Sequence, residues 1–227
     1  MNLILLGPPG TGKGTQAKLV ADRLHAAHVA SGDMFRVAVQ RGTDLGREAK
    51  GYMDRGELVP DSLTIAMLIE RIKEQDAKQG VIFDGYPRTL QQAVALDEAL
   101  AGQGKSVDLA LHVTASDDEI VGRLGGRWTC PDCGAIYHEA NQPPKVAGRC
   151  DNCGGDLRQR DDDKPEVVRA RLEKQRPPSE LLAHYRDAGK LVEVDGEQEV
   201  SLVTRDLLAA VEGLASRQEA RGRTTVG

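Results

Sequence analysis

A glycine-rich segment near the N-terminus has the residue types and spacing that bind phosphate groups. Residues 7–13 read GPPGTGK, which matches the pattern G-x-x-x-x-G-K between an apolar run and an amphipathic segment. Glycines let the backbone turn its N–H groups inward, and the start of a helix adds positive potential. Lys13 would supply a point charge for the β- and γ-phosphates of a nucleotide. A plain glycine-rich turn is the alternative, but this lysine at this spacing favours a nucleotide site.

The residue after this lysine is Gly14, where such loops usually carry Ser or Thr. Glycine has no side chain that could bind magnesium, so a Mg²⁺ ion would be held mainly by the nucleotide phosphates and by water. Asp84 ends the apolar run 81–83 and is the best candidate to anchor that water. An aspartate in this position could instead cap a helix or form a turn.

Six arginines outside this loop lie in or near two segments that interrupt the alternation of strands and helices. Phosphoryl transfer between nucleotides gathers many negative charges, and a planar guanidinium can bind two phosphate oxygens at once. A single arginine on a solvated helix face is common without any phosphate-binding role. It is the shared placement of the six that favours phosphate binding. The six are Arg36, Arg88, Arg123, Arg127, Arg160 and Arg171.

The four cysteines of the chain form two C-x-x-C pairs, at 130–133 and 150–153. Sixteen residues separate the pairs, which is within the spacing of ribbon-type zinc sites. Four thiolates leave no open position on a tetrahedral Zn²⁺, so the metal would be structural rather than catalytic. A redox pair or buried thiols are the alternatives, but a lone redox motif would not be duplicated at this spacing. The predicted ligands are Cys130, Cys133, Cys150 and Cys153.

Short apolar runs alternate with amphipathic segments, which predicts an α/β fold with a parallel sheet wrapped by helices. The expected strands are 2–6, 27–30, 81–84, 109–113 and 191–195. The expected helices are 13–25, 34–40, 44–53, 62–74, 90–100, 117–124, 165–176 and 199–211. Ser116 followed by Glu119 predicts a capping box. The polar segment 213–227 predicts a frayed helix end and a loose tail.

Composition and charge exclude some classes of protein. The 227 residues include 30 basic and 35 acidic side chains, a net charge of −5, so no global positive field holds nucleic acid or an anionic membrane. No apolar run approaches the ~18 residues of a membrane span, and the run at 3–6 lacks the features of a signal peptide. We therefore expect a cytoplasmic monomer that binds neither nucleic acid nor membrane.

Taken together, the motifs resemble those of the adenylate kinase family, in its long bacterial form with a zinc-binding lid. The resemblance runs from residue 1 to about 211 and rests on GPPGTGKGTQ at 7–16, SGDMFR at 31–36, DGYPRT at 84–89, and Gln92. It implies the P-loop nucleoside monophosphate kinase fold, a five-stranded parallel sheet wrapped by helices. The implied regions are a core of 1–30, 60–125 and 164–227, a monophosphate-binding insertion of 31–59, and a zinc-bearing lid of 126–163.

The resemblance implies reversible transfer, ATP + AMP = 2 ADP, by a direct in-line step with lid closure. It implies Mg²⁺ bound with ATP, and a structural Zn²⁺. The implied catalytic residues are Lys13, Asp84, Arg88, Arg123, Arg160 and Arg171. The implied ATP-binding residues are Gly10, Thr11, Gly12, Lys13, Gly14, Thr15, Arg123, Arg127, Ile136, Tyr137 and Gln198. The implied AMP-binding residues are Ser31, Arg36, Glu57, Val59, Gly85, Arg88, Gln92, Arg160 and Arg171.

Two other functions fit part of this pattern. A kinase for another nucleoside monophosphate would share the loop and the arginines, and would differ in whether the region of Gln92 and Ser31, where many relatives carry Thr, accepts adenine. A nucleotide-switched nucleic-acid binder would use the zinc ribbon to hold DNA or RNA. Aromatic residues make up only 3% of the chain, and such binders need interleaved aromatics and surplus positive charge. The pattern therefore favours the adenylate kinase prediction.

Overall fold

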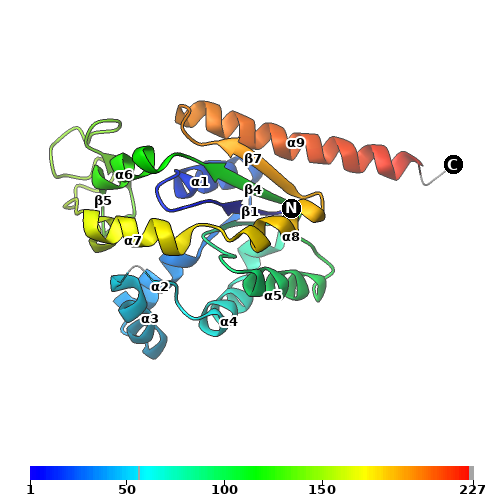
Figure 1. Cartoon of the computed structure of the whole chain (residues 1–227), viewed down its shortest axis with the longest axis horizontal. Helices are drawn as coiled ribbons and strands as arrows, with labels where there is room; N and C mark the ends of the chain where they lie inside the picture. Colours follow the sequence, from blue (N-terminus) through cyan, green and yellow to red (C-terminus); the bar gives the residue numbers. More distant parts are fainter. Residues whose placement is uncertain (56, 225–227) are drawn as a thin grey trace.

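A parallel sheet of five strands forms the centre of the computed structural model, which describes residues 1–55 and 57–224 (Figure 1). The strand order is β2-β3-β1-β4-β7. The strands are β1 (Asn2–Leu6), β2 (Ala27–Ala30), β3 (Val81–Asp84), β4 (Leu109–Thr114) and β7 (Leu191–Asp195). All five predicted strands are present, and β4 extends one residue beyond its predicted end. Every residue of β1 is buried, as a central strand covered on both faces requires.

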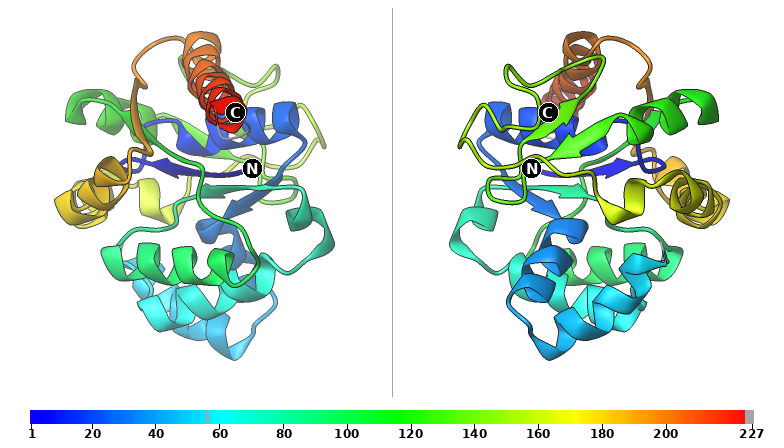
Figure 2. Two further views of the ribbon diagram at one scale, coloured as in Figure 1. Left: turned by 90° about the vertical axis from the view of Figure 1, so that its right-hand side faces the viewer. Right: turned by 90° about the vertical axis from the view of Figure 1, so that its left-hand side faces the viewer.

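Helices cover both faces of this sheet (Figures 1 and 2). On one face, α1 (Lys13–Leu24) and α9 (Val200–Thr224) bury side chains such as Val20 and Leu207 against Leu3 and Leu5. On the other face, α4 (Asp61–Arg71), α5 (Leu90–Ala101) and α8 (Ser179–Asp187) pack against strand residues such as Ile4 and Phe83. A short 3₁₀ helix, η1 (Gln75–Lys78), leads into β3. In the described part of the chain, no helix combines the length and hydropathy needed to span a bilayer.

Two further groups of elements lie at one end of the sheet (Figure 1). The first is α2 (Ser31–Gln40) and α3 (Asp44–Asp54), which bury Phe35 and Ala49 in a small core of their own with Val59. The second is the antiparallel pair β5 (Arg127–Thr129) and β6 (Ile136–His138), followed by the 3₁₀ helix η2 (Asp161–Asp163). Helices α6 (Asp117–Gly125) and α7 (Pro165–Gln175) flank the second group and pack on each other through Ile120 and Val168.

Several local predictions were incomplete or wrong. The sequence pattern did not predict α8, β5 or β6, and α2 begins at Ser31 instead of at the predicted residue 34. The predicted capping box is absent. The side chain of Ser116 does not cap α6. The reciprocal bond from the Ser116 N–H to Glu119 is also missing, because this N–H donates to Glu197 (2.6 Å) and Glu119 accepts a hydrogen bond from Arg123 Nε (2.7 Å). After the predicted frayed helix end, a loose tail is expected within 213–227; this expectation is wrong up to residue 224, since α9 continues to Thr224, and residues 225–227 lie outside the described residues.

Candidate active site

The loop between β1 and α1 brings a helix N-terminus and open backbone N–H groups to the end of the sheet. Gly10 has φ +87°, and a Cβ there would lie 2.8 Å from the Ile120 side chain, so only glycine fits. Gly12, with φ +89°, precedes α1 and gives it no side-chain cap, and the first turn carries no acid. These N–H groups are therefore available to an anion, and the helix dipole favours negative charge.

Lys13 lies half-buried over this loop. Its ammonium donates a hydrogen bond to the Pro8 carbonyl and is 3.4 Å from Thr11 Oγ1. Burial lowers the pKa of Lys13 to about 7, although Asp84 acts to raise it. A phosphate placed against this ammonium would favour its charged form.

Asp84 lies beside the loop because β1 and β3 are parallel neighbours, with Leu5 in register with Asp84. A Cβ on Gly14 would lie 3.2 Å from Asp84 Oδ2, so the carboxylate and the glycine that replaces Ser or Thr are adjacent. Burial acts to raise the pKa of Asp84, but the neighbouring His28, whose Nε2 lies 3.5 Å from the carboxylate, and the charge of Lys13 outweigh it and hold the pKa below its ordinary value. The carboxylate is therefore ionised at neutral pH, as an anchor for Mg²⁺-bound water must be.

A cleft of about 1280 Å³ opens over the loop, between the two groups of elements at this end of the sheet. It exceeds the usual volume of a small-molecule site and can hold a nucleotide triphosphate. The predicted site residues that line it come from the loop, from α1, α2, β3, α6, β5, β6 and α7, and from the segments that follow β3, precede η2 and follow β7. They are Gly10, Thr11, Gly12, Lys13, Gly14, Thr15, Arg36, Asp84, Gly85, Arg88, Arg123, Arg127, Ile136, Tyr137, Arg160, Arg171 and Gln198.

A smaller pocket adjoins this cleft, and the two share lining residues that include Arg36, Arg88 and Arg171. Apolar side chains such as Phe35 and Met53 form part of its wall. The predicted site residues that line it are Ser31, Arg36, Glu57, Val59, Gly85, Arg88, Gln92 and Arg171. The structure thus gathers the residues implied for both nucleotides at two adjoining cavities, although Arg160, which was implied for AMP, lines the larger cleft and not the smaller pocket.

The turn after β3 holds Arg88 at the junction of the two cavities. The Gly85 carbonyl accepts a hydrogen bond from Ser31 Oγ and another from Arg88 Nε, both at 2.7 Å. Burial and the nearby Arg171 lower the pKa of Arg88 to about 10. Its guanidinium therefore stays charged at neutral pH and lacks a full counter-charge, which a phosphate would supply.

The buried amide of Gln92 is oriented by two hydrogen bonds. Its Oε1 accepts from the Arg88 backbone N–H (2.8 Å), and its Nε2 donates to Asp61 (2.6 Å). Asp61 also accepts a hydrogen bond from Thr89 Oγ1 at 2.7 Å. No sequence signal pointed to Asp61, because the contact joins the starts of α4 and α5 and depends on how those helices pack.

Asp163 connects the start of the lid segment to helix α7. It is fully buried, and it accepts hydrogen bonds from Arg127 Nε (2.7 Å) and from Arg171 Nη1 (3.0 Å). Burial and Arg36 lower the pKa of Arg160, just before Asp163, to about 10. One buried carboxylate thus holds two of the predicted phosphate-binding arginines in place.

Arg123 makes a similar connection on the other side of the cleft. It donates from Nη1 to the Gly196 carbonyl (2.8 Å), and it pairs with Glu119. The turn that contains Gly196 also contains Gln198, whose amide donates to the Asp195 carbonyl at 3.2 Å. Helix α6 is therefore joined to the turn after β7 at the mouth of the cleft.

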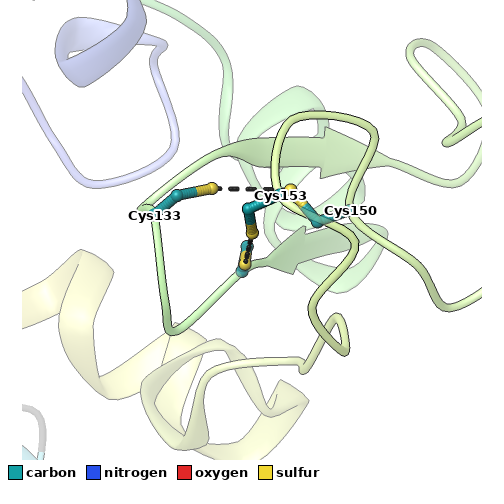
Figure 3. A group of neighbouring side chains, drawn as sticks. Cys133, Cys150 and Cys153 are labelled. Atoms are coloured by element: carbon teal, nitrogen blue, oxygen red, sulfur yellow. Dashed lines mark hydrogen bonds between the residues drawn. The ribbon is translucent and has the colours of Figure 1, made fainter.

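The four cysteine sulfurs lie together in the β5–β6 region, all within 4.8 Å of one another. Figure 3 shows Cys133, Cys150 and Cys153 directed toward a common point. The Sγ atoms of Cys130 and Cys153 are 3.4 Å apart, and those of Cys133 and Cys150 are 3.5 Å apart. These distances are too long for disulfides, at ~2.05 Å, and close to the ~3.8 Å edge of a tetrahedron with Zn–S bonds of ~2.3 Å. The donor set therefore fits zinc.

Known proteins of one family match this sequence along most of its length. The sequence model of the adenylate kinase family matches residues 5–190. An adenylate kinase of Geobacter sp. (strain M21) is 50% identical over 214 residues, covering 93% of this chain and 99% of that protein. An adenylate kinase of Archaeoglobus fulgidus is 48% identical over 217 residues, covering 95% and 100%. One of Staphylococcus aureus (strain Mu50) is 45% identical over 217 residues, covering 94% and 100%.

Proposed function

The chain belongs to the adenylate kinase family and transfers a phosphoryl group in the reaction ATP + AMP = 2 ADP, and we propose how its residues divide that work. The observation that carries the proposal is the convergence of Lys13 with six arginines on two adjoining cavities. Phosphoryl transfer needs little beyond positioning and charge stabilisation. A half-buried cluster of basic side chains whose pKa values are lowered is suited to the phosphates of two nucleotides.

The larger cleft binds ATP in this proposal. The loop N–H groups and Lys13 bind its β- and γ-phosphates, because they lie at the helix N-terminus beside the open cleft. Arg123 and Arg127 bind phosphate oxygens from the side of α6 and the lid. Further loop and donor-base contacts are assigned to Gly10, Thr11, Gly12, Gly14, Thr15, Ile136, Tyr137 and Gln198.

The smaller pocket binds AMP. Arg36 and Arg88 bind its phosphate. Two internal hydrogen bonds of Gln92 use one amide N–H and one lone pair of Oε1, and the second N–H and the second lone pair bind the edge of the adenine. Ser31 supports this site through its hydrogen bond to Gly85, although Ser lacks the methyl group of Thr. Glu57 and Val59 complete the wall of the pocket.

The transfer itself takes place between the two sites. An oxygen of the AMP phosphate attacks the γ-phosphorus in line, and the bond from that phosphorus to the β–γ bridging oxygen breaks. Arg88, Arg160 and Arg171 stabilise the charge on the migrating group, since all three line the larger cleft. Closure of the lid, segment 126–163, over the core and the insertion 31–59 excludes water from the reaction, a motion for which adenylate kinases are a familiar example.

Adenylate kinases use Mg²⁺ with ATP, and the ion would supply charge neutralisation to the β- and γ-phosphates when bound. Asp84 would hold it through water, because it is ionised and lies against Gly14, which offers no ligand. We assign Zn²⁺ to the four cysteines as a structural metal. Its site lies in the lid, and four sulfur ligands leave no position for a substrate. We further propose that the enzyme acts as a cytoplasmic monomer.

A phosphotransfer assay with ATP as donor and AMP, UMP, CMP or GMP as acceptor tests the function. We expect AMP to be used far better than the other three, because the Gln92 amide is placed to form hydrogen bonds with the edge of adenine. Preference for a pyrimidine monophosphate would assign the chain to a different nucleoside monophosphate kinase. Near-normal turnover in a folded Lys13→Met variant would overturn the role of the phosphate loop.

A further inference from the structure

Gln175 lies where the two cavities meet and has no role in the division of work proposed above. It is the last residue of α7 and lines both cavities, as Arg88 and Arg171 do. It follows Arg171 by four residues, about one helical turn, so the two side chains emerge on the same face of the helix. That face is the one turned toward the junction of the cavities.

The side chain of Gln175 contacts Arg88 directly. Arg88 donates from Nη1 to Gln175 Oε1 at 2.9 Å and from Nε to the Gly85 carbonyl at 2.7 Å. A guanidinium is planar and rigid, so two hydrogen bonds from different nitrogens fix both its position and the plane in which it lies. The remaining N–H groups of Arg88 can then donate to a phosphate without a further loss of side-chain conformational entropy.

The chemical type of the group that accepts the Arg88 hydrogen bond, an amide oxygen, is as relevant as its position. Gln175 is neutral, so it orients Arg88 without supplying a counter-charge. By contrast, Arg127 and Arg171 are held by the Asp163 carboxylate. A carboxylate at position 175 would compete with substrate phosphate for the same guanidinium, whereas an amide leaves its charge available.

Helix α7 adds a second consequence. The same helix carries Arg171, whose Nη1 donates to the Asp163 carboxylate and to the Asp162 carbonyl. Since Gln175 and Arg171 are on one helix, the Gln175 contact sets the spacing between Arg88 on the β3–α5 turn and Arg171. These are two of the arginines that the proposed function places around the migrating phosphoryl group.

We propose that Gln175 is a positioning residue that holds the guanidinium of Arg88 in the orientation and spacing required for the acceptor phosphate. This inference rests on the proposed function, because it takes the binding of AMP phosphate by Arg88 from it. It adds a residue whose effect passes through Arg88 and not through contact with the nucleotide.

Steady-state kinetics of Gln175→Met tests the inference, since Met has a similar length and no strong hydrogen-bond acceptor. Loss of one hydrogen bond to a charged group predicts a fall in kcat/KM for AMP of about ten- to 150-fold, with KM for ATP nearly unchanged. Gln175→Glu should also lower kcat/KM for AMP, through a higher KM. Glu173→Gln, at an exposed position of the same helix, serves as the matched control and should behave as the parent.

A double-mutant cycle distinguishes positioning from simple packing. Lysine at position 88 cannot make both hydrogen bonds of the arginine, so Gln175→Met should cost less than about two-fold when added to Arg88→Lys. Three results would overturn the inference. They are an equal loss of kcat/KM for AMP on adding Gln175→Met to the parent and to Arg88→Lys, a rise in KM for ATP as large as that for AMP, or parent-like kinetics of Gln175→Met. A parent protein that does not phosphorylate AMP would instead overturn the proposed function, and circular dichroism melting of each variant checks that it is folded.

Discussion

At the scale of single residues, the cleft combines buried charges that the protein itself does not fully neutralise. Lys13 and Arg88 have lowered pKa values mainly because they are buried, and neighbouring arginines add to the effect. Asp84 is ionised among them because His28 and Lys13 favour its charge. Such a site is strained electrostatically until anionic phosphates enter it, so part of the binding free energy comes from relieving repulsion between cations.

The pKa of Lys13 leads to a prediction about proton uptake. The free protein has a Lys13 pKa of about 7, and bound phosphate raises it. Binding therefore takes up a proton at any pH between the two pKa values, and affinity falls as pH rises above about 7. At pH 8 phosphates are already ionised, given a second pKa of ~6, so the uptake comes from the protein.

Isothermal titration calorimetry at pH 8, in buffers with different ionisation enthalpies, measures this uptake. We expect about 0.5–0.9 proton per Mg–ATP bound to the parent, and much less for Lys13→Met. Equal uptake by parent and variant would show that another group binds the proton.

Gln92 gives a second prediction at this scale. Gln92→Leu should weaken the use of AMP by ~1–3 kcal/mol, because the polar edge of the base loses its partner. The use of ATP should barely change. Substrate titrations give the two KM values, and Gln91→Leu, at the exposed neighbouring position, is the matched control. Gln92→Leu also removes a hydrogen-bond partner of Asp61, so the melting temperature of this variant should fall. An equal loss for ATP and AMP would contradict the assignment.

At the scale of elements, the sequence predicted what depends on local pattern and missed what depends on packing. The five strands and the phosphate loop were predicted because apolar runs, glycines and Lys13 signal them locally. The strands β5 and β6 have three residues each and form around the cysteine cluster, so no periodicity reveals them. Contacts such as Gln175 with Arg88, or His28 with Asp84, were missed because they require the strand order and the position of α7.

The lid illustrates how little apolar burial holds its small elements together. Its buried cluster consists of Tyr137, Leu157 and the two cysteines Cys130 and Cys150. A core of this size cannot offset the conformational entropy of a segment of nearly forty residues, 126–163. Metal binding would supply the missing free energy, as it does in other small zinc-binding units.

Zinc removal is therefore predicted to affect stability more than chemistry. A chelator, or Cys130→Ser combined with Cys150→Ser, should lower the melting temperature and loosen the lid, so that turnover at low temperature falls only as far as the lid closes less often. Lys13 and Arg88 lie outside the lid and remain in place. Calorimetry, activity at low temperature and metal analysis check this, with one zinc expected per parent chain. Immediate loss of activity without a change in melting would mean that the metal takes part in the reaction.

At the scale of the whole molecule, charge is distributed unevenly. The net charge of the chain is −5, yet basic side chains outnumber acidic ones in the lining of the larger cleft. The lysines and arginines there are Lys13, Lys18, Arg36, Arg88, Arg123, Arg127, Arg158, Arg160 and Arg171. A cleft with an excess of one sign of charge concentrates ions of the opposite sign, whereas a net negative surface repels them elsewhere. The protein therefore attracts nucleotides to one place at the end of its sheet.

This distribution predicts that nucleotide association depends on salt while folding does not. The screening length falls from about 10 Å at 0.1 M salt to about 3 Å at 1 M, so the association rate constant of ATP should fall several-fold over that range. Stopped-flow binding measures the rate, and melting temperature measures stability. Arg123→Gln removes a cation from the cleft and should reduce the salt dependence. Arg205→Gln, on the exposed side of α9, removes the same charge outside the cleft and should leave it unchanged. An equal reduction in both variants would show that net charge, and not the field of the cleft, governs association.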